Sequence, residues 1–563
     1  MKSKQQIIVC DTEDDSCGNL YRIHFYNGKE YFRFTDRIEA LLWLSKQRNL
    51  DIWCCNLEYD IINVYGIEFL EKVKLSFGKT KLYFATGNNS IKWIDTLNHW
   101  SMSVQKMGEY IGLEKLDSGD DYNNSDYCDR DCKIVYDFIH HMIEQYKQIG
   151  ADLRITLPSS ALHLWKQYNQ DNIKLKRIKE SDIEYFRKSY TGGRTEAFFI
   201  GAIDSVYTID VNSLYPTVMK NYEYPNPYTG IIDTPCIEKM GITECTIKTP
   251  EDCLFPILPY KGEKLLFPIG KFRGFFCNNE LQYALDNGYK ILKIHSGKYC
   301  NNSCNPFVEY VDLIYAEKQL AEESGDAFLR YTAKLFLNSL YGKFAQTKET
   351  YIVQSIESYL QKFNAASPED KKKLWKKIEG NIIFGNLVLL EEQQEQYPSH
   401  SNFIWSSYVT AYGRIYLHNE IKKLSLLGAK ILYCDTDSIH YCFNKSLHTS
   451  SRLMGYWNLE EAGVTGEYKG AKEYILTGEK KKVKVKGIRK GNKEAFFRTD
   501  AAVIEKPLKI RASFRRKESV LLAKTKKRVG AKAGIWILET RERASEYKKR
   551  IIQSDGFTVP VKI

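Results

Sequence analysis

Two aspartates separated by one residue, Asp435 and Asp437, are the side chains whose type and spacing most directly suggest chemistry. Apolar residues flank them on both sides, which predicts two short strands joined by a tight acidic turn at Thr436. Two carboxylates so close together repel each other unless a cation lies between them. Because an isolated Asp-Thr-Asp turn is usually a solvated turn, a metal site here depends on what the rest of the chain supplies.

A third carboxylate and a cation come from two other segments. Asp210 lies at the end of an alternating segment, residues 204–211, which predicts a strand, and Pro216 stops strand pairing because it lacks an N–H. Lys334 lies in a segment of helical periodicity with one polar and one apolar face. The polar face consists of Arg330, Lys334, Asn338 and Tyr341, and the apolar face of Leu329, Ala333, Phe336 and Leu340. Three carboxylates that can hold two divalent metals, with a lysine suited to phosphates, are what nucleotidyl transfer requires.

The three segments, in this order, resemble motifs A, B and C of family B DNA polymerases. DVNSLYP, which starts at Asp210, and KLFLNSLYGK, which starts at Lys334, are similar to the protein-primed branch found in phages and linear plasmids. The resemblance implies that Asp210, Asp437 and the Val211 carbonyl hold the metals. It also implies that Asp435 supports the site from nearby, so all three aspartates are candidate catalytic residues.

The same resemblance implies contacts to the incoming nucleotide and to DNA. Tyr215 is expected to lie under the sugar, where its rigid ring would exclude a ribose 2′-OH. The residues implied in nucleotide binding are Ser213, Leu214, Tyr215, Arg330, Lys334, Asn338 and Tyr341, with Lys318 as a further phosphate contact. The residues implied in DNA binding are Tyr190, Gly192, Gly193, Ser339, Gly342, Thr436, Lys472 and Tyr474. Arg194, directly after the paired glycines, is also expected to reach phosphate.

A second set of carboxylates stands in the first part of the chain. Residues 7–10 predict a buried strand that leads to Asp11 and Glu13. Residues two apart in a strand point to the same side, so both carboxylates can join one metal cluster. Residues 125–148 predict a helix that carries Tyr127 and Asp131 on one face, four residues apart.

These patterns resemble the DEDD-type 3′–5′ exonuclease of proofreading polymerases. The family pattern D-x-E matches Asp11 and Glu13, N-x-x-x-D matches Asn56 to Asp60, and Y-x-x-x-D matches Tyr127 to Asp131. In that family the carboxylates bind two metals that activate a water, and the tyrosine positions the water. The implied contacts to single-stranded DNA are Asn56, Tyr59, Thr96 and Leu97, and the implied catalytic support is Lys115. Cys55 departs from the pattern, because the family usually has histidine there.

Charge and cysteine content limit the partners and the compartment. The net charge is +12, and residues 506–563 alone hold 17 Lys plus Arg against 5 acidic residues, which favours a phosphate backbone as partner over a merely solvated basic face. The 14 cysteines are expected to be reduced thiols, because no signal peptide opens the chain. A zinc site formed by Cys253, Cys277, Cys300 and Cys304 is the less favoured alternative. No apolar run approaches the length of a membrane span, about 18 residues.

The predicted fold is an α/β multidomain protein, with an RNase H-like 3′–5′ exonuclease domain followed by a right-hand palm, fingers and thumb polymerase with two insertions. The predicted domains are the exonuclease (1–188), linker and first part of the palm (189–220), a first insertion that docks a terminal protein (221–310), fingers (311–346), an extra helix and second-insertion hairpin (347–402), palm (403–503) and basic thumb (504–563). Eight of the 14 prolines lie between Pro225 and Pro306, which predicts a loop-rich first insertion. The second insertion is expected to hold a basic helix starting at Ser367 and a hairpin around Gly385 and Asn386.

These patterns lead to the hypothesis of a DNA-directed DNA polymerase with 3′–5′ exonuclease activity. It would replicate a linear viral or plasmid genome processively, with strand displacement, from a protein primer. The expected cofactor is Mg²⁺, two ions per active site, with Mn²⁺ as a substitute. The expected partners are primer-template DNA, dNTPs, a terminal protein and a single-stranded DNA-binding protein, with no membrane, for a monomer in the cytoplasm (of the host, if viral). The alternatives are a non-enzymatic DNA-binding relic of the fold and a reverse transcriptase, although reverse transcriptases commonly carry adjacent aspartates.

Overall fold

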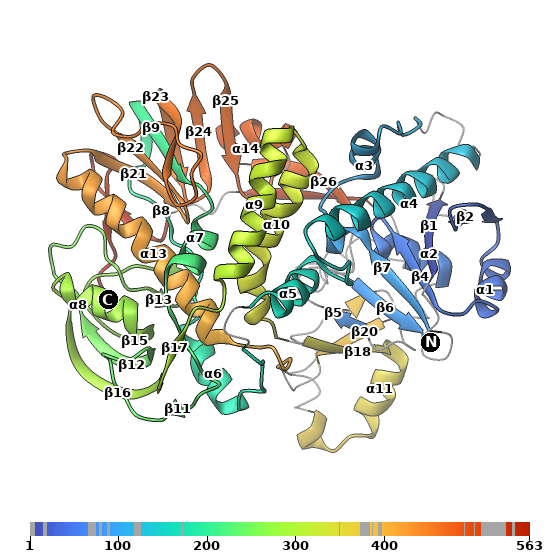
Figure 1. Cartoon of the computed structure of the whole chain (residues 1–563), viewed down its shortest axis with the longest axis horizontal. Helices are drawn as coiled ribbons and strands as arrows, with labels where there is room; N and C mark the ends of the chain where they lie inside the picture. Colours follow the sequence, from blue (N-terminus) through green and yellow to red (C-terminus); the bar gives the residue numbers. More distant parts are fainter. Residues whose placement is uncertain are drawn as a thin grey trace. The chain divides into compact units, whose positions relative to one another are not determined.

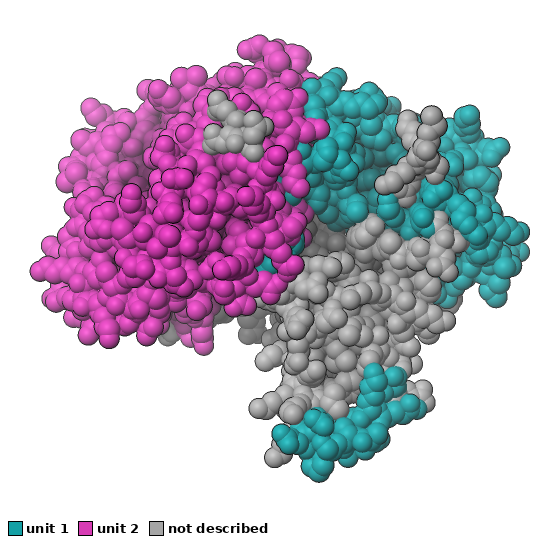
Figure 2. Space-filling view, turned by 60° about the horizontal axis from the view of Figure 1, so that its bottom comes forward, with its two compact units in different colours: residues 1–163, 347–398, 505–538 teal, residues 164–346, 399–504, 539–563 magenta. Residues whose placement is uncertain are grey.

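A computed structural model of the chain divides into two compact units (Figure 1, Figure 2). The described residues are 6–14, 20–65, 75–77, 82–86, 90–117, 125–169, 173–347, 349–371, 383–384, 387–391, 397–488, 490–499, 501–507, 536–542 and 547–563. Unit 1 comprises residues 1–163, 347–398 and 505–538, and unit 2 comprises residues 164–346, 399–504 and 539–563. Each unit is therefore assembled from three separate stretches of sequence.

Unit 1 is built on a ten-stranded sheet with the order β19-β20-β18-β5-β6-β7-β4-β1-β2-β3. Its strands are β1 (Gln6–Asp14), β2 (Leu20–Tyr26), β3 (Tyr31–Phe34), β4 (Leu50–Cys54), β5 (Leu75–Phe77), β6 (Leu82–Thr86), β7 (Ile91–Asp95), β18 (Glu349–Ser355), β19 (Ile383–Phe384) and β20 (Leu387–Glu391). The central strands β1, β4 and β7 are parallel, and β2 and β3 continue antiparallel beyond β1. This mixed order agrees with the predicted RNase H-like fold.

Helices lie on both faces of this sheet. They are α1 (Arg37–Ser45), α2 (Leu57–Tyr65), the 3₁₀ turn η2 (Thr96–Asn98), α3 (Val104–Ile111), α4 (Ser125–Gln148) and α11 (Ile356–Ala365). The helix predicted over residues 125–148 is confirmed as α4, and Gly150 follows it with a φ of 72°. Cys10 of β1 packs with Leu57 and Ile61 of α2. Because side chains alternate along a strand, Asp11 and Glu13 face the other side, where α4 lies.

Unit 2 is built on a seven-stranded antiparallel sheet with the order β25-β24-β23-β9-β22-β21-β8. Its strands are β8 (Thr195–Ala197), β9 (Gly201–Val211), β21 (Lys430–Asp435), β22 (Ser438–Cys442), β23 (Trp457–Gly470), β24 (Glu473–Thr477) and β25 (Lys481–Val485). Helix α13 (Phe403–Leu426) covers one face, where its Leu417 and Ile421 pack against Ile209 and Ile439 of the sheet. The expected strand before Asp210 and the expected hairpin around Thr436 are thereby confirmed.

A pair of adjacent helices, α9 (Val308–Ser324) and α10 (Ala327–Phe344), stands beside this sheet in unit 2 (Figure 1). The two faces predicted for α10 are confirmed, because the apolar residues Leu329, Ala333, Phe336 and Leu340 are all buried. Arg330, Lys334 and Asn338 are exposed on the other face. The buried stripe therefore anchors α10 and leaves its cations available for a ligand.

The residues after Asp210 form a helix, α7 (Leu214–Asn221), whereas the sequence predicted only that strand pairing stops at Pro216. Pro216 is tolerated because it lies in the first turn, where a backbone N–H has no intrahelical partner. Ser213 precedes the helix with a φ of 60°, and this conformation turns the chain away from the direction of strand β9. The unexpected helix fixes the side chain of Tyr215 on a rigid element.

The first insertion is more regular than its proline content suggests. It holds a four-stranded sheet with the order β11-β16-β12-β15, and helix α8. The elements of the region are β10 (Tyr224–Pro225), β11 (Ile231–Ile232), β12 (Gly241–Lys248), β13 (Tyr260–Lys261), β14 (Leu265–Leu266), β15 (Lys271–Cys277), α8 (Asn278–Asp286), β16 (Lys290–Cys300) and β17 (Ser303–Cys304). The prolines fall mainly between the long strands, so the prediction of a loop-rich module was wrong for this sheet.

The second insertion contributes three strands to the sheet of unit 1. The predicted hairpin forms between β19 and β20, and β20 pairs with β18, which in turn pairs with β5. Gly385 and Asn386 at its tip lie outside the described residues. Ser367 starts a helical turn, with its Oγ accepting the backbone N–H of Asp370 at 3.2 Å. The remaining part of the predicted basic helix, residues 372–377, also lies outside the described residues.

The end of the chain packs on unit 2. Strands β28 (Arg550–Ile552) and β29 (Thr558–Pro560) form a hairpin, and Phe557 makes a bridge with Phe199 beside β8. Lys524–Arg528 of the expected thumb lie outside the described residues. Arg550 is buried and donates to Thr558 and to the carbonyl of Leu254, so it does not grip DNA phosphates as the basic composition suggested. It is a structural residue of this unit.

The remaining elements complete the description of the chain. They are α5 (Leu157–Gln167), α6 (Glu180–Ser189), η3 (Lys490–Asn492), α14 (Lys493–Thr499), β26 (Ala501–Pro507) and β27 (Trp536–Glu542). Helix α6 packs on α13 and β15 of unit 2. Within the described parts of the chain, no helix is both long enough and apolar enough to cross a membrane.

Candidate active sites

The three aspartates of the polymerase-like motifs meet at one end of the unit 2 sheet. Asp435 pairs with Ser438 across the hairpin, and Ser438 is in register with Asp210 on the neighbouring strand β9. The turn is tied to β9 because the backbone N–H of Val211 donates to the carbonyl of Asp437 at 2.8 Å. Thr436 occupies the left-handed region with a φ of 64°. Strand pairing therefore brings residues from two distant segments together.

Asp210 and Asp437 carry the electrostatic signature of a metal site. Burial, followed by the charge of Asp437, raises the pKa of Asp210 to about 8. Burial and the charge of Asp435 raise the pKa of Asp437 to about 6. Lys334 lowers both pKa values without cancelling these effects. Partly buried carboxylates whose pKa values are raised by burial and by each other's charge are suited to divalent cations, which relieve the repulsion between them.

Asp435 differs from the other two aspartates because its charge is already balanced. Lys472 Nζ donates to both of its carboxylate oxygens, at 2.6 and 2.7 Å. The hydroxyl of Thr195, its cross-strand neighbour on β8, donates to Oδ1 at 2.9 Å. This geometry agrees with a supporting role for Asp435 and leaves Asp210 and Asp437 to face a ligand.

The cations expected to meet phosphates gather on α9 and α10. Arg330 pairs with Glu322 at 2.7 Å, and Lys318 lies 3.9 Å from the same carboxylate. Burial lowers the pKa of Lys318, and although Glu322 opposes this shift, the nearby charges of Arg330 and Lys334 add to it. Three cations with one carboxylate leave a local positive excess, which suits a triphosphate.

Tyr215 and Tyr341 form an aromatic floor next to these groups. Their ring centroids are 4.6 Å apart, and a Cβ at Gly413 would lie only 3.2 Å from the Tyr215 ring. Glycine at 413 therefore lets α13 approach the ring closely. Asn338 is exposed, Ser339 donates to the carbonyl of Phe336, and Gly342 has open space around it. Leu214 is 2% exposed, which makes it a packing residue instead of the predicted nucleotide contact.

The Tyr190–Gly193 segment lies against the acidic turn. A Cβ at Gly193 would stand 2.7 Å from the Thr436 side chain, so only glycine permits this approach. Arg414 donates to the carbonyls of Thr191 and Gly192 and forms a bidentate pair with Glu280. The segment therefore supports the turn directly. Tyr190 is half-buried, in edge contact with Phe403.

Arg194 does not reach phosphate, contrary to the sequence prediction. It is 2% exposed, its Nε donates to Glu196 at 2.7 Å, and its Nη1 donates to the carbonyl of Pro256. Tyr474 is also corrected: it is 7% exposed and packs on Tyr433 and His440 in the core beneath the turn. Of the predicted DNA contacts Lys472 and Tyr474, only Lys472 lines a cavity.

That cavity is a strongly basic pocket of about 500 Å³ in unit 2. Its lysines are Lys264, Lys469, Lys472, Lys486, Lys548 and Lys549. Glu473 is the only acidic side chain that lines it, so the pocket attracts anions. Lys549 also donates to the carbonyl of Thr195 on β8, the residue whose hydroxyl donates to Asp435.

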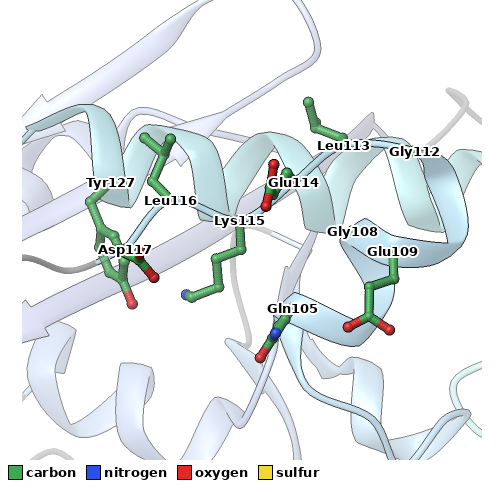
Figure 3. A pocket seen from close by; sticks show the side chains of 10 residues that line it. All are labelled: Gln105, Gly108, Glu109, Gly112, Leu113, Glu114, Lys115, Leu116, Asp117 and Tyr127. Atoms are coloured by element: carbon green, nitrogen blue, oxygen red, sulfur yellow. The ribbon is translucent and has the colours of Figure 1, made fainter.

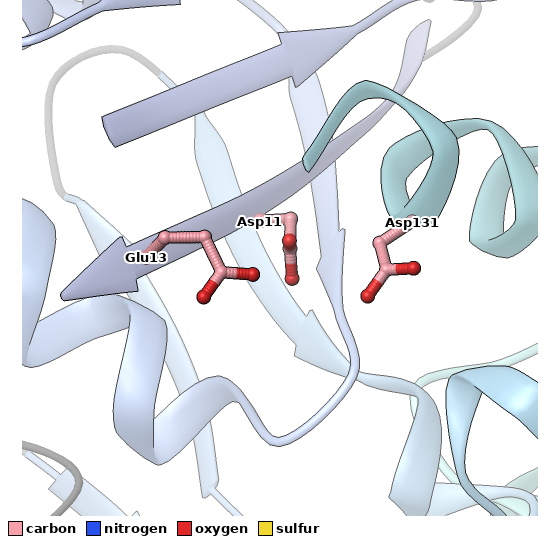
Figure 4. A group of neighbouring side chains, drawn as sticks. All are labelled: Asp11, Glu13 and Asp131. Carbon is pink, nitrogen blue, oxygen red and sulfur yellow. The ribbon is translucent and has the colours of Figure 1, made fainter. Parts of the chain in front are cut away.

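The second acidic site lies in unit 1. Asp11 and Glu13 on β1 and Asp131 on α4 point toward one another, with ligand oxygens all within 4.8 Å (Figure 4). Burial and the charges of Glu13, Asp131 and Asp60 raise the pKa of Asp11 well above its usual range. Among the described residues this is the one such cluster of three or more metal-ligating side chains, so the alternative zinc site of four cysteines is not formed. Each described cysteine is a free thiol.

Asp60, the fourth predicted carboxylate, lies just outside this cluster. Its Oδ1 accepts the hydroxyl of Thr12 at 2.9 Å, and Asn63 donates to the same hydroxyl. Its Oδ2 and the Oδ1 of Asp131 are buried without a hydrogen-bond partner in the described structure. Orphaned carboxylate oxygens beside three other carboxylates fit a divalent cation, since burial without a partner is costly.

Lys115 joins the cluster from the loop before α4. Its Nζ pairs with Asp131 and lies 4.4 Å from the centroid of the Tyr127 ring. Burial alone would lower the pKa of Lys115, but the charge of Asp131 and the hydrogen bonds to Asp131 and Tyr127 together outweigh it, and the pKa is raised. Lys115 and Tyr127 line a pocket of about 520 Å³ next to the carboxylates (Figure 3). Lys115 therefore lies beside the carboxylates, and its role as catalytic support stays a prediction.

Two segments predicted to contact single-stranded DNA are hydrogen-bonded to one residue, Asp95, which was not predicted from the sequence. Asp95, the last residue of β7, accepts the backbone N–H of Leu97 at 2.9 Å and that of Asn56 at 3.2 Å. Thr96 is buried, whereas Leu97 and Tyr59 are partly exposed. Asp95 precedes a Thr-Leu pair as an N-cap does, a signal that could have identified it. Arg414 and Glu280 were missed because they are 134 residues apart in sequence.

Comparison with known proteins agrees with this geometry. A family model described as DNA polymerase type B, organellar and viral, matches residues 114–379. A probable DNA polymerase of Podospora anserina is 28% identical over 391 residues, which cover 64% of this chain and 32% of that protein. The DNA-directed DNA polymerase of Enterobacteria phage PRD1 is 25% identical over 370 residues, which cover 62% of this chain and 59% of that protein. The chain therefore spans less than two thirds of these relatives.

A solved structure titled Phi29 DNA polymerase complexed with primer-template DNA matches 96% of this chain and 100% of its own, with a TM-score of 0.69 and 18% identity. This match shows the fold: the chain has the multidomain fold of a family B DNA polymerase. Over residues 114–379 the chain is similar to DNA polymerases of type B, organellar and viral, in agreement with the resemblance that its motifs predicted.

Proposed function

We propose that the chain is a DNA-directed DNA polymerase that carries a 3′–5′ exonuclease in unit 1. The observation that carries the polymerase proposal is the meeting of Asp210, near the end of β9, with Asp437, in the turn that leads into the adjacent strand β22, with raised pKa values and with Lys334 nearby. Three carboxylates with a phosphate-binding cation support nucleotidyl transfer over mere DNA binding. The non-enzymatic relic is less favoured, because a binding protein has no need for carboxylates that repel the DNA backbone.

The polymerase residues have separate tasks in this proposal. Asp210, Asp437 and the carbonyl of Val211 would hold divalent ions, which supply charge neutralisation at the phosphate and activation of the primer hydroxyl. Asp435 keeps the turn in place through Lys472 and Thr195. Arg330, Lys334 and Lys318 would bind the triphosphate, and Tyr215 would lie under the sugar. Lys472 and the other lysines of the basic pocket would bind phosphates of the primer strand, beside the Gly193 segment.

The exonuclease residues are assigned in the same way. Asp11, Glu13, Asp131 and Asp60 would hold divalent ions, which supply an activated water and stabilise the leaving 3′ oxygen. Tyr127 would orient that water and Lys115 would balance the charge of Asp131. Asn56, Tyr59, Thr96 and Leu97 would contact the frayed single strand.

The finer biological assignments rest on the resemblance to protein-primed relatives. We propose Mg²⁺ as the ion, with Mn²⁺ as substitute, and processive, strand-displacing replication of a linear genome in the cytoplasm, of the host if the genome is viral. The first insertion would dock a terminal protein, the second would help to enclose DNA, and a single-stranded DNA-binding protein would be a further partner. The predicted linker, palm, fingers and thumb would have the same roles as the parts with these names in family B DNA polymerases.

The test uses purified protein, Mg²⁺ and a 5′-labelled primer on a long template, with and without dNTPs. Extension with dNTPs and shortening without them are expected. Binding without extension, both with the DNA primer and with candidate terminal proteins as primers, would favour the relic and overturn the polymerase proposal. Extension without shortening would overturn the exonuclease assignment alone.

A further inference from the structure

The ends of two neighbouring strands in unit 1 lie side by side. Strands β4 and β7 are parallel, and Cys54 is in register with Asp95. The chain leaves β4 through Cys55 and Asn56 into α2, and leaves β7 directly into η2. Parallel strands end at the same edge of a sheet, so the two exits begin next to each other. These exits carry the two segments proposed to hold single-stranded DNA.

One carboxylate oxygen joins the two exits. Asp95 Oδ1 accepts the backbone N–H of Leu97, the second residue of η2, and the backbone N–H of Asn56, which precedes α2. Asn56 has a φ of 78°, a conformation that costs free energy unless its surroundings hold it. Asp95 is 4% exposed, where hydrogen bonds to a carboxylate are stronger than in water.

We infer that Asp95 is a positioning residue for the exonuclease, which fixes the spacing between the Asn56 segment and the Thr96–Leu97 segment so that both can hold one frayed DNA strand. It does not contact the reacting phosphate and is not a member of the carboxylate cluster. The inference rests on the proposed exonuclease. It goes beyond that proposal by naming the group that sets the geometry of the single-strand site.

The proposed role requires a hydrogen-bond acceptor at the position of Asp95 Oδ1; it does not require a negative charge. Asp95→Asn keeps an oxygen at the same place and should retain single-strand binding. Asp95→Ala removes the acceptor from both exits. Asp95→Ser keeps a cap for Leu97, because serine is a good N-cap, but its shorter side chain loses Asn56, already 3.2 Å away. Asp51→Ala is the matched control: Asp51 lies on β4 and pairs with Lys92 of β7 without touching either exit.

The experiment measures the affinity of a fluorescent oligothymidylate in EDTA, then shortening of the same oligonucleotide in Mg²⁺, and extension of a duplex primer as a folding control. Asp95→Ala should bind the single strand about 10-fold more weakly, the equivalent of one charged hydrogen bond. Its KM for shortening should rise more than its kcat falls. Asp95→Asn and Asp51→Ala should stay within about twofold of the wild type, and Asp95→Ser should be intermediate.

Several results would overturn the inference. These are wild-type affinity in Asp95→Ala, or in Asp95→Ser if Asp95→Ala does not fold, and an Asp95→Asn variant as weak as Asp95→Ala. If the wild-type chain itself neither binds nor shortens the oligonucleotide, the exonuclease proposal fails first. If the wild type does both and the Asp95 variants match it, only the positioning role fails.

Discussion

The carboxylates of unit 1 and those at the acidic turn of unit 2 both repel one another, but a neighbouring lysine is placed differently in the two sites. In unit 1 the neighbouring cation, Lys115, pairs with Asp131, which is itself a member of the cluster. In unit 2 the neighbouring cation, Lys472, pairs with Asp435, and its charge lowers the pKa of Asp437 too little to offset the effect of burial. A divalent ion must therefore share a ligand with a lysine in the first site, but not in the second.

The origin of the ligands differs as well. The unit 2 aspartates lie on one sheet, Asp210 on β9 and Asp435 and Asp437 at the β21–β22 turn, where backbone pairing of β22 with both other strands fixes their distance. In unit 1, Asp11 and Glu13 lie on a strand and Asp131 lies on a helix. Asp60 lies on another helix, α2, and accepts a hydrogen bond from the hydroxyl of Thr12. We conclude that the polymerase-like site is preset by the backbone, whereas the exonuclease-like site depends on side-chain packing. Four experiments test this difference between the two sites.

The largest effect is expected from Asp437→Asn. The substitution removes a proposed ligand of both metal ions while the hairpin, held by backbone bonds, stays intact. Primer extension should fall by a factor on the order of 10³ or more, because metal ions supply several kcal/mol of stabilisation at the phosphate. Shortening of single-stranded DNA should remain at the wild-type rate. A variant that still extends primers would remove Asp437 from the metal site.

The reciprocal experiment is Asp60→Ala in unit 1. Shortening should fall by about 100-fold, since Asp60 stands beside the three-carboxylate cluster and its loss leaves the other ligands in place. Extension of a duplex primer serves as the control and should be unchanged. Shortening at the wild-type rate would show that Asp60 is not part of the site.

The contrast between the two lysines can be measured directly by metal titration. Lys115→Met removes the cation that competes for Asp131, so half-maximal shortening should need about 10-fold less Mn²⁺, given the size of a close charge interaction near a protein surface. Lys472→Met should leave the Mn²⁺ requirement of extension within about threefold, since Asp435 is only a support. Equal shifts in both variants would contradict the comparison drawn above.

The smallest expected effect is on stability without metal. The pKa of Asp210 in the folded chain, about 8, lies above that of an unfolded chain, about 3.9. The folded state therefore binds more protons between these values, and the free energy of unfolding falls as pH rises through this window. In EDTA, Asp210→Asn should raise Tm by a few degrees at pH 8 and change it little at pH 4.

The control for that measurement is Asp435→Asn, which breaks an ion pair with Lys472 instead of relieving repulsion. It should not raise Tm at pH 8. Adding Mg²⁺ should stabilise the wild type more than Asp210→Asn, because only the wild type retains the full ligand set. A wild type that is unaffected by Mg²⁺ would count against a metal at Asp210.

The parts of the chain that sequence reasoning predicted well are those with local signals. Helix α4 follows from its period, and the two faces of α10 follow from the spacing of Lys334 and its neighbours. The pairing of Asp11 with Glu13 follows from strand alternation alone. Each of these predictions needed only residues within one element.

The predictions that failed concern side chains whose partners are far away in sequence. Arg194 was expected to meet phosphate but donates to the carbonyl of Pro256, 62 residues on. Arg550 was counted among the thumb cations but bonds to Leu254, 296 residues earlier. A single sequence shows charge and spacing but not burial against a distant backbone, so buried and exposed arginines look the same. Asp95 was missed for a milder reason, because its capping role uses only backbone N–H groups.

The hairpin formed by β28 and β29 has a consequence for how the chain matures. Thr558 donates to the carbonyl of Ala197, 361 residues earlier, and Tyr547 accepts the N–H of Ala197 across 350 residues. Such remote closure makes β8, and the support of Asp435, dependent on a segment that is synthesised 350 residues after β8. The parallel strands β1, β4 and β7, which are close in sequence, can pair much earlier during synthesis. A nascent chain would thus complete its degradative site before its synthetic one, and ribosome-arrested chains of increasing length should gain protease resistance in that order.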